Sequence, residues 1–268
     1  AMAMGRAVRP LLPGALKDKV PLRRAPGAWP APRHARRMLA LAGCAQPAMM
    51  PSVNAATARV LDAMGIALVE APGAGCCGAV RHHLDDHPGS HADARRNIDA
   101  WWPLIERGEV EALVMTASAC GVQVKDYGHL LRKDAAYAAK AERVSALTRD
   151  VGEVLAQELD ALKSVLDLPA RPTPLAFHAP CTLQHGQKAK SAVESVLLTC
   201  GFELTTVPEA HLCCGSAGTY SILQPTLSMA LRERKLGALA SGGAECIASA
   251  NVGCISHLAA GTDTPVRH

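Results

Sequence analysis

Short apolar runs alternate with stretches of helical periodicity along most of the chain. Apolar runs at 38–42, 66–69 and 112–115 have the length of buried strands. Between them, apolar side chains recur at helical spacing over 52–64 and 92–107, and a glycine follows each stretch where a helix would stop. The order strand, helix, strand, helix, strand is typical of a parallel sheet covered by helices.

The same order returns in the C-terminal half of the chain. Strands are predicted at 175–177, 202–207 and 246–248, with helices over 191–200 and 224–240 between them. We therefore predict an α/β fold of two tandem similar domains. Each would be a small parallel sheet flanked by helices, and a pseudo-twofold axis would relate the two.

The expected division is an arm over 1–37, a first domain over 38–168 and a second over 169–268. Residues 5–37 hold nine basic residues against one acid, which favours a solvated connector over contact with an acidic partner or anionic lipid. The stretch 123–168 is predicted to be a helical insertion. Four of its leucines share one helical face: Leu155, Leu159, Leu162 and Leu166.

Eight of the ten cysteines form two matching quartets, each a single cysteine, an adjacent pair followed by glycine, and a last cysteine. In both quartets 31 residues separate the single cysteine from the pair. The gap from pair to last cysteine is 42 residues in the first and 39 in the second. This repeat predicts two ligand sets: Cys44, Cys76, Cys77 and Cys120; then Cys181, Cys213, Cys214 and Cys254.

Each quartet cysteine follows the end of a predicted strand. Because ligands gather at the carboxyl edge of parallel sheets, three loops in each repeat would bring four thiolates together. The two remaining cysteines, Cys200 and Cys246, align with apolar positions of the first repeat and are predicted to be core residues. Disulfides are disfavoured, because adjacent cysteines pair poorly and the sequence shows no export signal.

Four thiolates can hold a zinc ion or an iron–sulfur cluster. Structural zinc sites usually use knuckles with two to four residues between cysteines, and no such knuckle occurs here. Adjacent cysteines suit a polynuclear centre, and a following glycine lets backbone N–H groups approach its sulfurs. The pattern favours one [4Fe–4S]-type cluster per repeat, with zinc in one or both sites as the alternative.

Composition sets broad limits on function. Apolar residues make up 49% of the chain and charged residues 19%, as in soluble proteins with an ample core. The net charge of +4 is too small to indicate nucleic-acid binding, and no apolar run is long enough to span a membrane. The sequence shows no phosphate-binding loop and no nucleophile–base pair, so we assign no catalytic residue.

The doubled cysteine pattern resembles the cysteine-rich CCG domain family, which includes heterodisulfide reductase B-type subunits, lactate-utilisation proteins and glycolate oxidase iron–sulfur subunits. Local stretches favour the last group along nearly the whole chain, namely 41–47, 75–83, 125–131, 251–254 and 262–268. The resemblance implies an electron-transfer subunit that relays electrons from flavin-containing glycolate oxidase subunits toward quinone. It also implies a cytoplasmic protein, with association at the inner face of the membrane as a further option.

Two alternatives remain open at this point: a cluster-based disulfide or quinone reductase of the heterodisulfide reductase B type, and a zinc-binding structural module. The chain departs from the family pattern at Ala117 and Asn251, where a Cys-x-x-Cys ending would place further cysteines. It also lacks the two ferredoxin-like modules that precede this region in glycolate oxidase subunits, so it resembles their C-terminal part.

Other polar residues give weaker signals. His178 lies three residues before Cys181, and His82 and His83 follow the first pair. These histidines would donate hydrogen bonds to a cluster or relay protons, although surface histidines are common. The segment Lys125–Tyr127 is predicted to be a solvated helix start, with a docking or quinone-side surface as the alternative.

Overall fold

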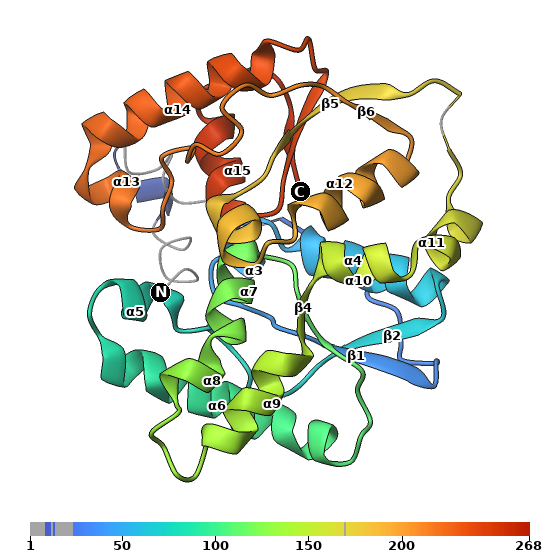
Figure 1. Cartoon of the computed structure of the whole chain (residues 1–268), viewed down its shortest axis with the longest axis vertical. Helices are drawn as coiled ribbons and strands as arrows, with labels where there is room; N and C mark the ends of the chain where they lie inside the picture. Colours follow the sequence, from blue (N-terminus) through green and yellow to red (C-terminus); the bar gives the residue numbers. More distant parts are fainter. Residues whose placement is uncertain (1–8, 12, 14–23, 169) are drawn as a thin grey trace.

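The computed structural model describes residues 9–11, 13, 24–168 and 170–268. Two four-stranded parallel sheets form its centre, in the orders β2-β1-β3-β4 and β6-β5-β7-β8. Figure 1 shows the second repeat stacked above the first. Most of the predicted arm, 1–8, 12 and 14–23, lies outside the described residues.

The first repeat contains four strands and their connecting helices, after a short 3₁₀ turn η1 (Arg9–Leu11). Its strands are β1 (Arg36–Ala40), β2 (Ile66–Glu70), β3 (Leu113–Met115) and β4 (Thr148–Asp150). Its helices are α3 (Gln46–Met49), α4 (Ser52–Ala63), α5 (Ala79–His83), α6 (His87–Glu106), α7 (Ser118–Lys125), α8 (Tyr127–Leu130), α9 (Ala138–Leu147), α10 (Val151–Gln157) and α11 (Leu159–Val165).

The second repeat has the same strand order. Its strands are β5 (Thr173–His178), β6 (Phe202–Leu204), β7 (Cys246–Ser249) and β8 (Val266–Arg267). A short π-helical turn, η2 (Thr182–Gly186), follows β5. The remaining helices are α12 (Lys190–Thr199), α13 (Tyr220–Leu223), α14 (Pro225–Ala240) and α15 (Val252–Ala259).

The α/β architecture and the three predicted strands of each repeat are confirmed. The fourth strands, β4 and β8, were not predicted, because both are short and lack an apolar run. The prediction that 123–168 is helical is wrong at β4, which pairs in parallel with β3. The four leucines nevertheless pack into one cluster together with Met64, Val196 and Cys200.

Apolar side chains cover both faces of the first sheet, which explains why its strands read as continuous apolar runs. Successive residues of a strand point to opposite faces. Leu39 of β1 therefore lies in one buried cluster, whereas its neighbours Met38 and Ala40 lie in another. In β5, Leu175 and Ala176 divide between two clusters in the same way.

The described segment before β1 packs on the first repeat. Trp29 contacts the cluster that contains Met38 and donates its indole N–H to the Leu68 carbonyl at 3.0 Å. Arg33 forms an ion pair with Asp62 of α4 at 2.6 Å. These contacts fix residues 29–33 against β2 and α4, a packing role that the basic, proline-rich composition does not reveal.

The two repeats meet at the start of α7. The Ser118 N–H donates to the Ala250 carbonyl at 2.9 Å, and the Ser118 hydroxyl lies 2.8 Å from that of Thr182. Gln187 donates from its side-chain amide to the Ser118 carbonyl at 3.0 Å. Ser118 thus joins the second repeat two residues before Cys120, so the carboxyl edges of both sheets approach this interface.

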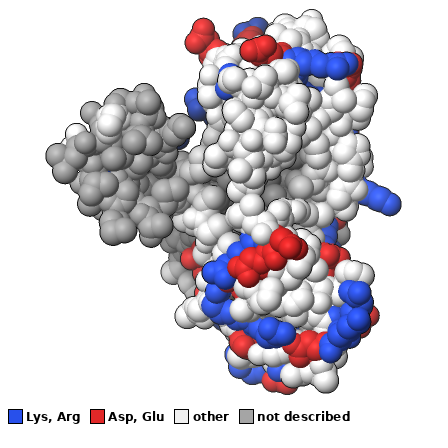
Figure 2. Space-filling view, turned by 90° about the vertical axis from the view of Figure 1, so that its left-hand side faces the viewer, with Lys and Arg blue, Asp and Glu red and all other residues white. Residues whose placement is uncertain are grey.

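Charged residues are distributed unevenly over the surface. Figure 2 shows side chains of both signs over the lower part of one face and a broad uncharged area above it. Four large apolar side chains are exposed on α13 and α14: Ile222, Leu223, Leu227 and Met229. None of the helices in the described ranges combines the length and apolarity needed to cross a bilayer.

Candidate metal centres

The first quartet gathers at the carboxyl edge of the first sheet. Cys44 follows β1, the pair Cys76–Cys77 follows β2, and Cys120 lies in α7 after β3. The sulfurs of Cys44 and Cys76 lie 3.4 Å apart, and hydrogen bonds link Cys77 to both Cys76 and Cys120. The four thiols form one continuous group, although their role as ligands remains a prediction.

The second quartet repeats this arrangement. Hydrogen bonds connect Cys181 to Cys213, Cys213 to Cys214 and Cys214 to Cys254. Cys214 is almost fully buried, like its equivalent Cys77, whereas the first member of each pair is partly exposed. All ten cysteines are free thiols, so no disulfide competes for these sulfurs.

The last cysteine of each quartet lies in the first turn of a helix. Cys120 is the third residue of α7 and Cys254 the third of α15. The two positions where the family pattern has a further cysteine, Ala117 and Asn251, are the N-caps of these helices. Asn251 accepts a hydrogen bond from the Gly253 N–H at 2.9 Å, so it caps the helix in place of a thiol.

The glycine after each pair lets the backbone turn tightly beside the sulfurs. Gly78 and Gly215 have φ angles of 85° and 89°, which side chains of L-residues rarely tolerate. A Cβ at Gly215 would lie 2.3 Å from the Ser228 carbonyl oxygen. The two glycine N–H groups lie 3.5 and 3.3 Å from the sulfurs of Cys76 and Cys213.

The thiols of each quartet differ in acidity. A hydrogen bond shared with Cys44 lowers the pKa of Cys76, and one shared with Cys181 lowers that of Cys213. The hydrogen bond with Cys214 lowers the pKa of Cys254 to about 6, an effect that burial opposes. Each quartet therefore contains a thiol that ionises readily, which favours metal binding because metals bind the thiolate.

Two buried polar residues hold the first cysteine pair in place. The Tyr127 hydroxyl donates to the Cys77 carbonyl at 2.9 Å and accepts from the Asn97 amide at 3.0 Å. Asn97 also donates to the Cys76 carbonyl at 2.8 Å. The prediction of a solvated helix start at Lys125–Tyr127 is wrong for Tyr127, which is fully buried against the pair.

A lysine occupies the position in the second repeat that corresponds to Asn97. Asn97 lies seven positions after Ser90, and Lys235 lies seven positions after Ser228. These two serines lie next to the glycine that follows each cysteine pair. Lys235 is 2% exposed and donates to the Glu209 carbonyl at 2.9 Å. It holds the loop before the second pair, and burial lowers the pKa of its ammonium group.

The three candidate histidines lie in different environments. His82 and His83 are at the end of α5, and the His82 ring contacts His87, with their Nδ1 atoms 3.3 Å apart. His178, at the end of β5, is 1% exposed. One of its ring nitrogens lies within 4.8 Å of the Cys214 and Cys254 sulfurs, so it belongs to the second site.

The remaining cysteines lie outside both quartets. Cys200 packs beside Met64 and Leu162, in agreement with its alignment to a buried helix turn. Cys246 is half-buried at the start of β7, and its thiol lies 3.7 Å from the Ile247 carbonyl.

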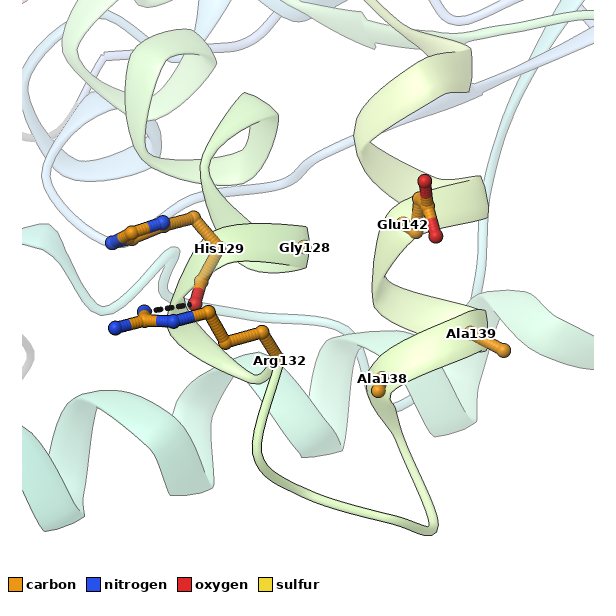
Figure 3. Close-up of a pocket in the computed structure, with 6 residues that line it drawn as sticks. All are labelled: Gly128, His129, Arg132, Ala138, Ala139 and Glu142. Carbon is orange, nitrogen blue, oxygen red and sulfur yellow. Dashed lines mark hydrogen bonds between the residues drawn. The ribbon is translucent and has the colours of Figure 1, made fainter.

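A surface depression between α8 and α9 lies apart from the cysteines. Figure 3 shows His129 and Arg132 on one wall and Glu142 on the other, with Arg132 hydrogen-bonded to the His129 carbonyl at 2.7 Å. No cysteine lines this depression. Its polar groups do not converge on one point, so the quartets remain the strongest candidate sites in the described chain.

Comparison with known proteins places these sites in context. The model of the cysteine-rich domain CCG matches residues 38–125 and 175–259. The chain is 52% identical over 268 residues to the glycolate oxidase iron-sulfur subunit of Escherichia coli (strain K12), covering 99% of this chain and 64% of that protein. It is 29% identical to the probable glycolate oxidase iron-sulfur subunit of Bacillus subtilis (strain 168), covering 85% and 50%. Lactate utilization protein A of Exiguobacterium sp. is 24% identical, covering 80% and 85%.

Proposed function

Because the chain belongs to the cysteine-rich CCG domain family, we propose that it is an electron-transfer protein that holds one iron–sulfur cluster in each repeat. The convergence of four thiols at the carboxyl edge of each sheet carries this proposal. The ligands of the first cluster would be Cys44, Cys76, Cys77 and Cys120. Those of the second would be Cys181, Cys213, Cys214 and Cys254.

The spread of the thiols supports a polynuclear centre. Four sulfurs around one zinc ion, each at about 2.3 Å, would lie roughly 3.7 Å from one another. Among the described residues, only His178, Cys214 and Cys254 bring three possible metal-ligand atoms within 4.8 Å of one another. No three sulfurs of one quartet are that close together. The quartets are wider than a single ion requires, whereas a [4Fe–4S] cluster binds thiolates at separate irons.

The contact between the repeats suits electron transfer between the two centres. Cys120 is two residues from Ser118, and Cys181 precedes Thr182, whose hydroxyl contacts that of Ser118. The first and second quartets therefore approach the same interface from opposite sides. An electron received at one centre would have a short path through packed protein to the other.

The chain would act within a larger glycolate oxidase or dehydrogenase complex. It spans 64% and 50% of the two similar iron-sulfur subunits, and their names as subunits imply partner chains. In that complex a flavin subunit would oxidise glycolate, and this chain would relay electrons toward quinone. The exposed apolar residues of α13 and α14, close in sequence to Cys213–Cys214, support assembly with a partner.

The test is to prepare the chain anaerobically and measure iron, acid-labile sulfide and the EPR spectrum of the reduced protein. Cys77→Ser should empty the first centre and Cys214→Ser the second, each leaving the other loaded. Cys200→Ser, the same change outside both quartets, is the matched control and should keep both. Zinc without sulfide would instead indicate a structural module.

Three further outcomes would count against the proposal. If either quartet variant remains folded but loses both centres equally, the repeats do not assemble separate clusters. Glycolate-dependent dye reduction by this chain alone would show that it oxidises the substrate itself. Reduction of a disulfide or of quinone by the isolated, reduced chain would favour the reductase alternative.

A further inference from the structure

The second candidate centre contains a buried imidazole whose only polar contact is with a predicted ligand. His178 is 1% exposed, and apart from the Cys254 thiol its ring nitrogens have no hydrogen-bond partner in the described structure. Buried polar groups of a purely structural core are normally hydrogen-bonded to the surrounding protein, and this ring is not.

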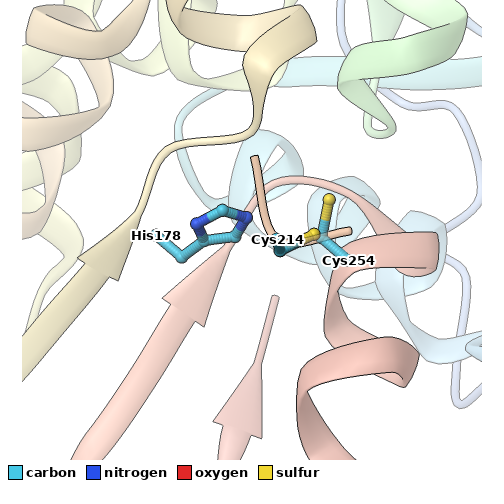
Figure 4. Close-up of side chains that lie close together, drawn as sticks. All are labelled: His178, Cys214 and Cys254. Carbon is cyan, nitrogen blue, oxygen red and sulfur yellow. The ribbon is translucent and has the colours of Figure 1, made fainter. Parts of the chain in front are cut away.

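The ring is directed toward two of the predicted ligands. Figure 4 shows it extending from the end of β5 toward the thiols of Cys214 and Cys254. The ligand atoms of these three residues all lie within 4.8 Å of one another. Ser249, which pairs with His178 in the sheet register, has a buried hydroxyl that also lacks a partner. That hydroxyl could bond the ring nitrogen that faces away from a metal, as metal-bound histidines usually require.

The first repeat shows that the fold does not need a histidine at this position. His178 lies three residues before Cys181, and Leu41 lies three residues before Cys44. Both residues are buried where the first strand of their sheet ends, so a leucine fills the same space in the first repeat. The imidazole is therefore a feature of the second centre and has no counterpart in the first.

We propose that His178 is a metal ligand of the second centre, alongside Cys214 and Cys254 and in place of Cys181 or Cys213, whereas the first centre is bound by thiolates alone. This proposal rests on the proposed function, because it changes the ligand set of one of the two clusters. Imidazole is neutral, whereas thiolate is anionic, and histidine ligation raises the reduction potential of iron–sulfur centres. The second centre would then have the higher potential, and electrons would move from the first repeat to the second.

The experiment uses the full chain, reconstituted anaerobically with ferrous iron and sulfide and labelled with ¹⁵N-histidine. Pulsed EPR of the reduced protein measures coupling between the cluster spin and histidine nitrogen. A strong coupling is expected in the unmodified chain and should be lost in His178→Leu, which copies the first repeat. His185→Gln, a change at an exposed histidine of the same repeat, is the matched control and should retain it.

His178→Cys provides a second variant, because a thiolate can replace the imidazole as ligand. It should keep the iron content of the unmodified chain while losing the nitrogen coupling. Circular dichroism of each variant verifies that the fold is intact. Absence of strong coupling in the unmodified chain, or its persistence in His178→Leu, would overturn the proposal.

The metal analysis separates this proposal from the proposed function. If the chain takes up zinc without sulfide, the electron-transfer proposal fails but the ligand assignment can still be read by X-ray absorption. Zinc–nitrogen distances of about 2.0–2.1 Å differ from zinc–sulfur distances of about 2.3 Å. A nitrogen scatterer that disappears in His178→Leu would support the ligand assignment, and its absence from the unmodified chain would refute it. A chain that binds neither iron nor zinc refutes both proposals.

Discussion

Replacing Tyr127 with phenylalanine removes one oxygen atom from the wall of the first candidate centre. That hydroxyl donates to the Cys77 carbonyl at 2.9 Å and accepts from the Asn97 amide at 3.0 Å. The ring remains buried and keeps its apolar contacts, so the change isolates the two hydrogen bonds. Burial raises the pKa of Tyr127 well above its ordinary value, which keeps the hydroxyl protonated as a donor.

The expected cost follows from what is left unpaired. Asn97 retains its bond to the Cys76 carbonyl at 2.8 Å, so the larger loss falls on the Cys77 carbonyl. A buried acceptor without a partner costs about 1–3 kcal/mol, and we expect a loss near 2 kcal/mol. In a chain of this size that loss would lower the melting temperature by about 4–8 °C.

Tyr137→Phe is the matched control, because it removes a hydroxyl that bonds to exposed Asp99 at 2.9 Å. Its cost should be below about 0.5 kcal/mol, since water can replace a surface partner. Urea unfolding gives the difference in stability, and iron analysis should show lower loading of the first centre in Tyr127→Phe. Equal costs for the two variants, or equal iron loss from both centres, would refute the assigned role of Tyr127.

Three further changes test other parts of the structure. Trp29→Ala should lower the free energy of unfolding in urea by about 2–3 kcal/mol, because it removes apolar packing and the hydrogen bond to the Leu68 carbonyl. An unchanged free energy of unfolding would mean that this segment is not held on the domain. Burial raises the pKa of Asp150 from 3.8 to about 6, so the folded state binds more protons and stability should fall by about 2 kcal/mol from pH 4 to pH 6. Asp150→Asn keeps the helix cap and should abolish this loss of stability between pH 4 and pH 6. If stability still falls with pH as in the unmodified chain, the role assigned to Asp150 is wrong. Lys235→Asn copies Asn97 of the first repeat and removes the ammonium group. It should lower the reduction potential of the second centre by roughly 60 mV, the one-electron equivalent of about 1.4 kcal/mol. A redox titration should show this shift and an unchanged potential of the first centre.

The elements that carry the cysteines could be predicted because their signals are local. β1 and β2 are apolar runs close to glycine, and α4 has helical periodicity that ends one residue before Gly65. The strands β4 and β8 could not be predicted in this way. They contain three and two residues, and their position is fixed by pairing with β3 and β7 rather than by their own sequence.

The surroundings of the first centre were harder to predict than its thiols. Tyr127 follows two charged residues, so its neighbourhood resembles a solvated helix start, yet long-range contacts bury it against Cys77. The scarcity of aromatic residues, 3% of the chain, was an available signal that each one has a packing role. Asn97 and Lys235 could have been found by extending the repeat alignment seven residues beyond the matching serines.

The two repeats share a fold but differ in the chemistry around their cysteines. The strand order and the quartets are duplicated, but the buried groups around the quartets differ. Leu41 and Asn97 in the first repeat have neutral side chains, whereas the corresponding positions in the second repeat hold the imidazole of His178 and the ammonium group of Lys235. A positive surrounding stabilises the reduced, more negative state of a thiolate-bound cluster, since opposite charges attract most strongly where water is excluded. Two copies of one fold would in this way hold centres of different potential, which gives electron flow between them a direction.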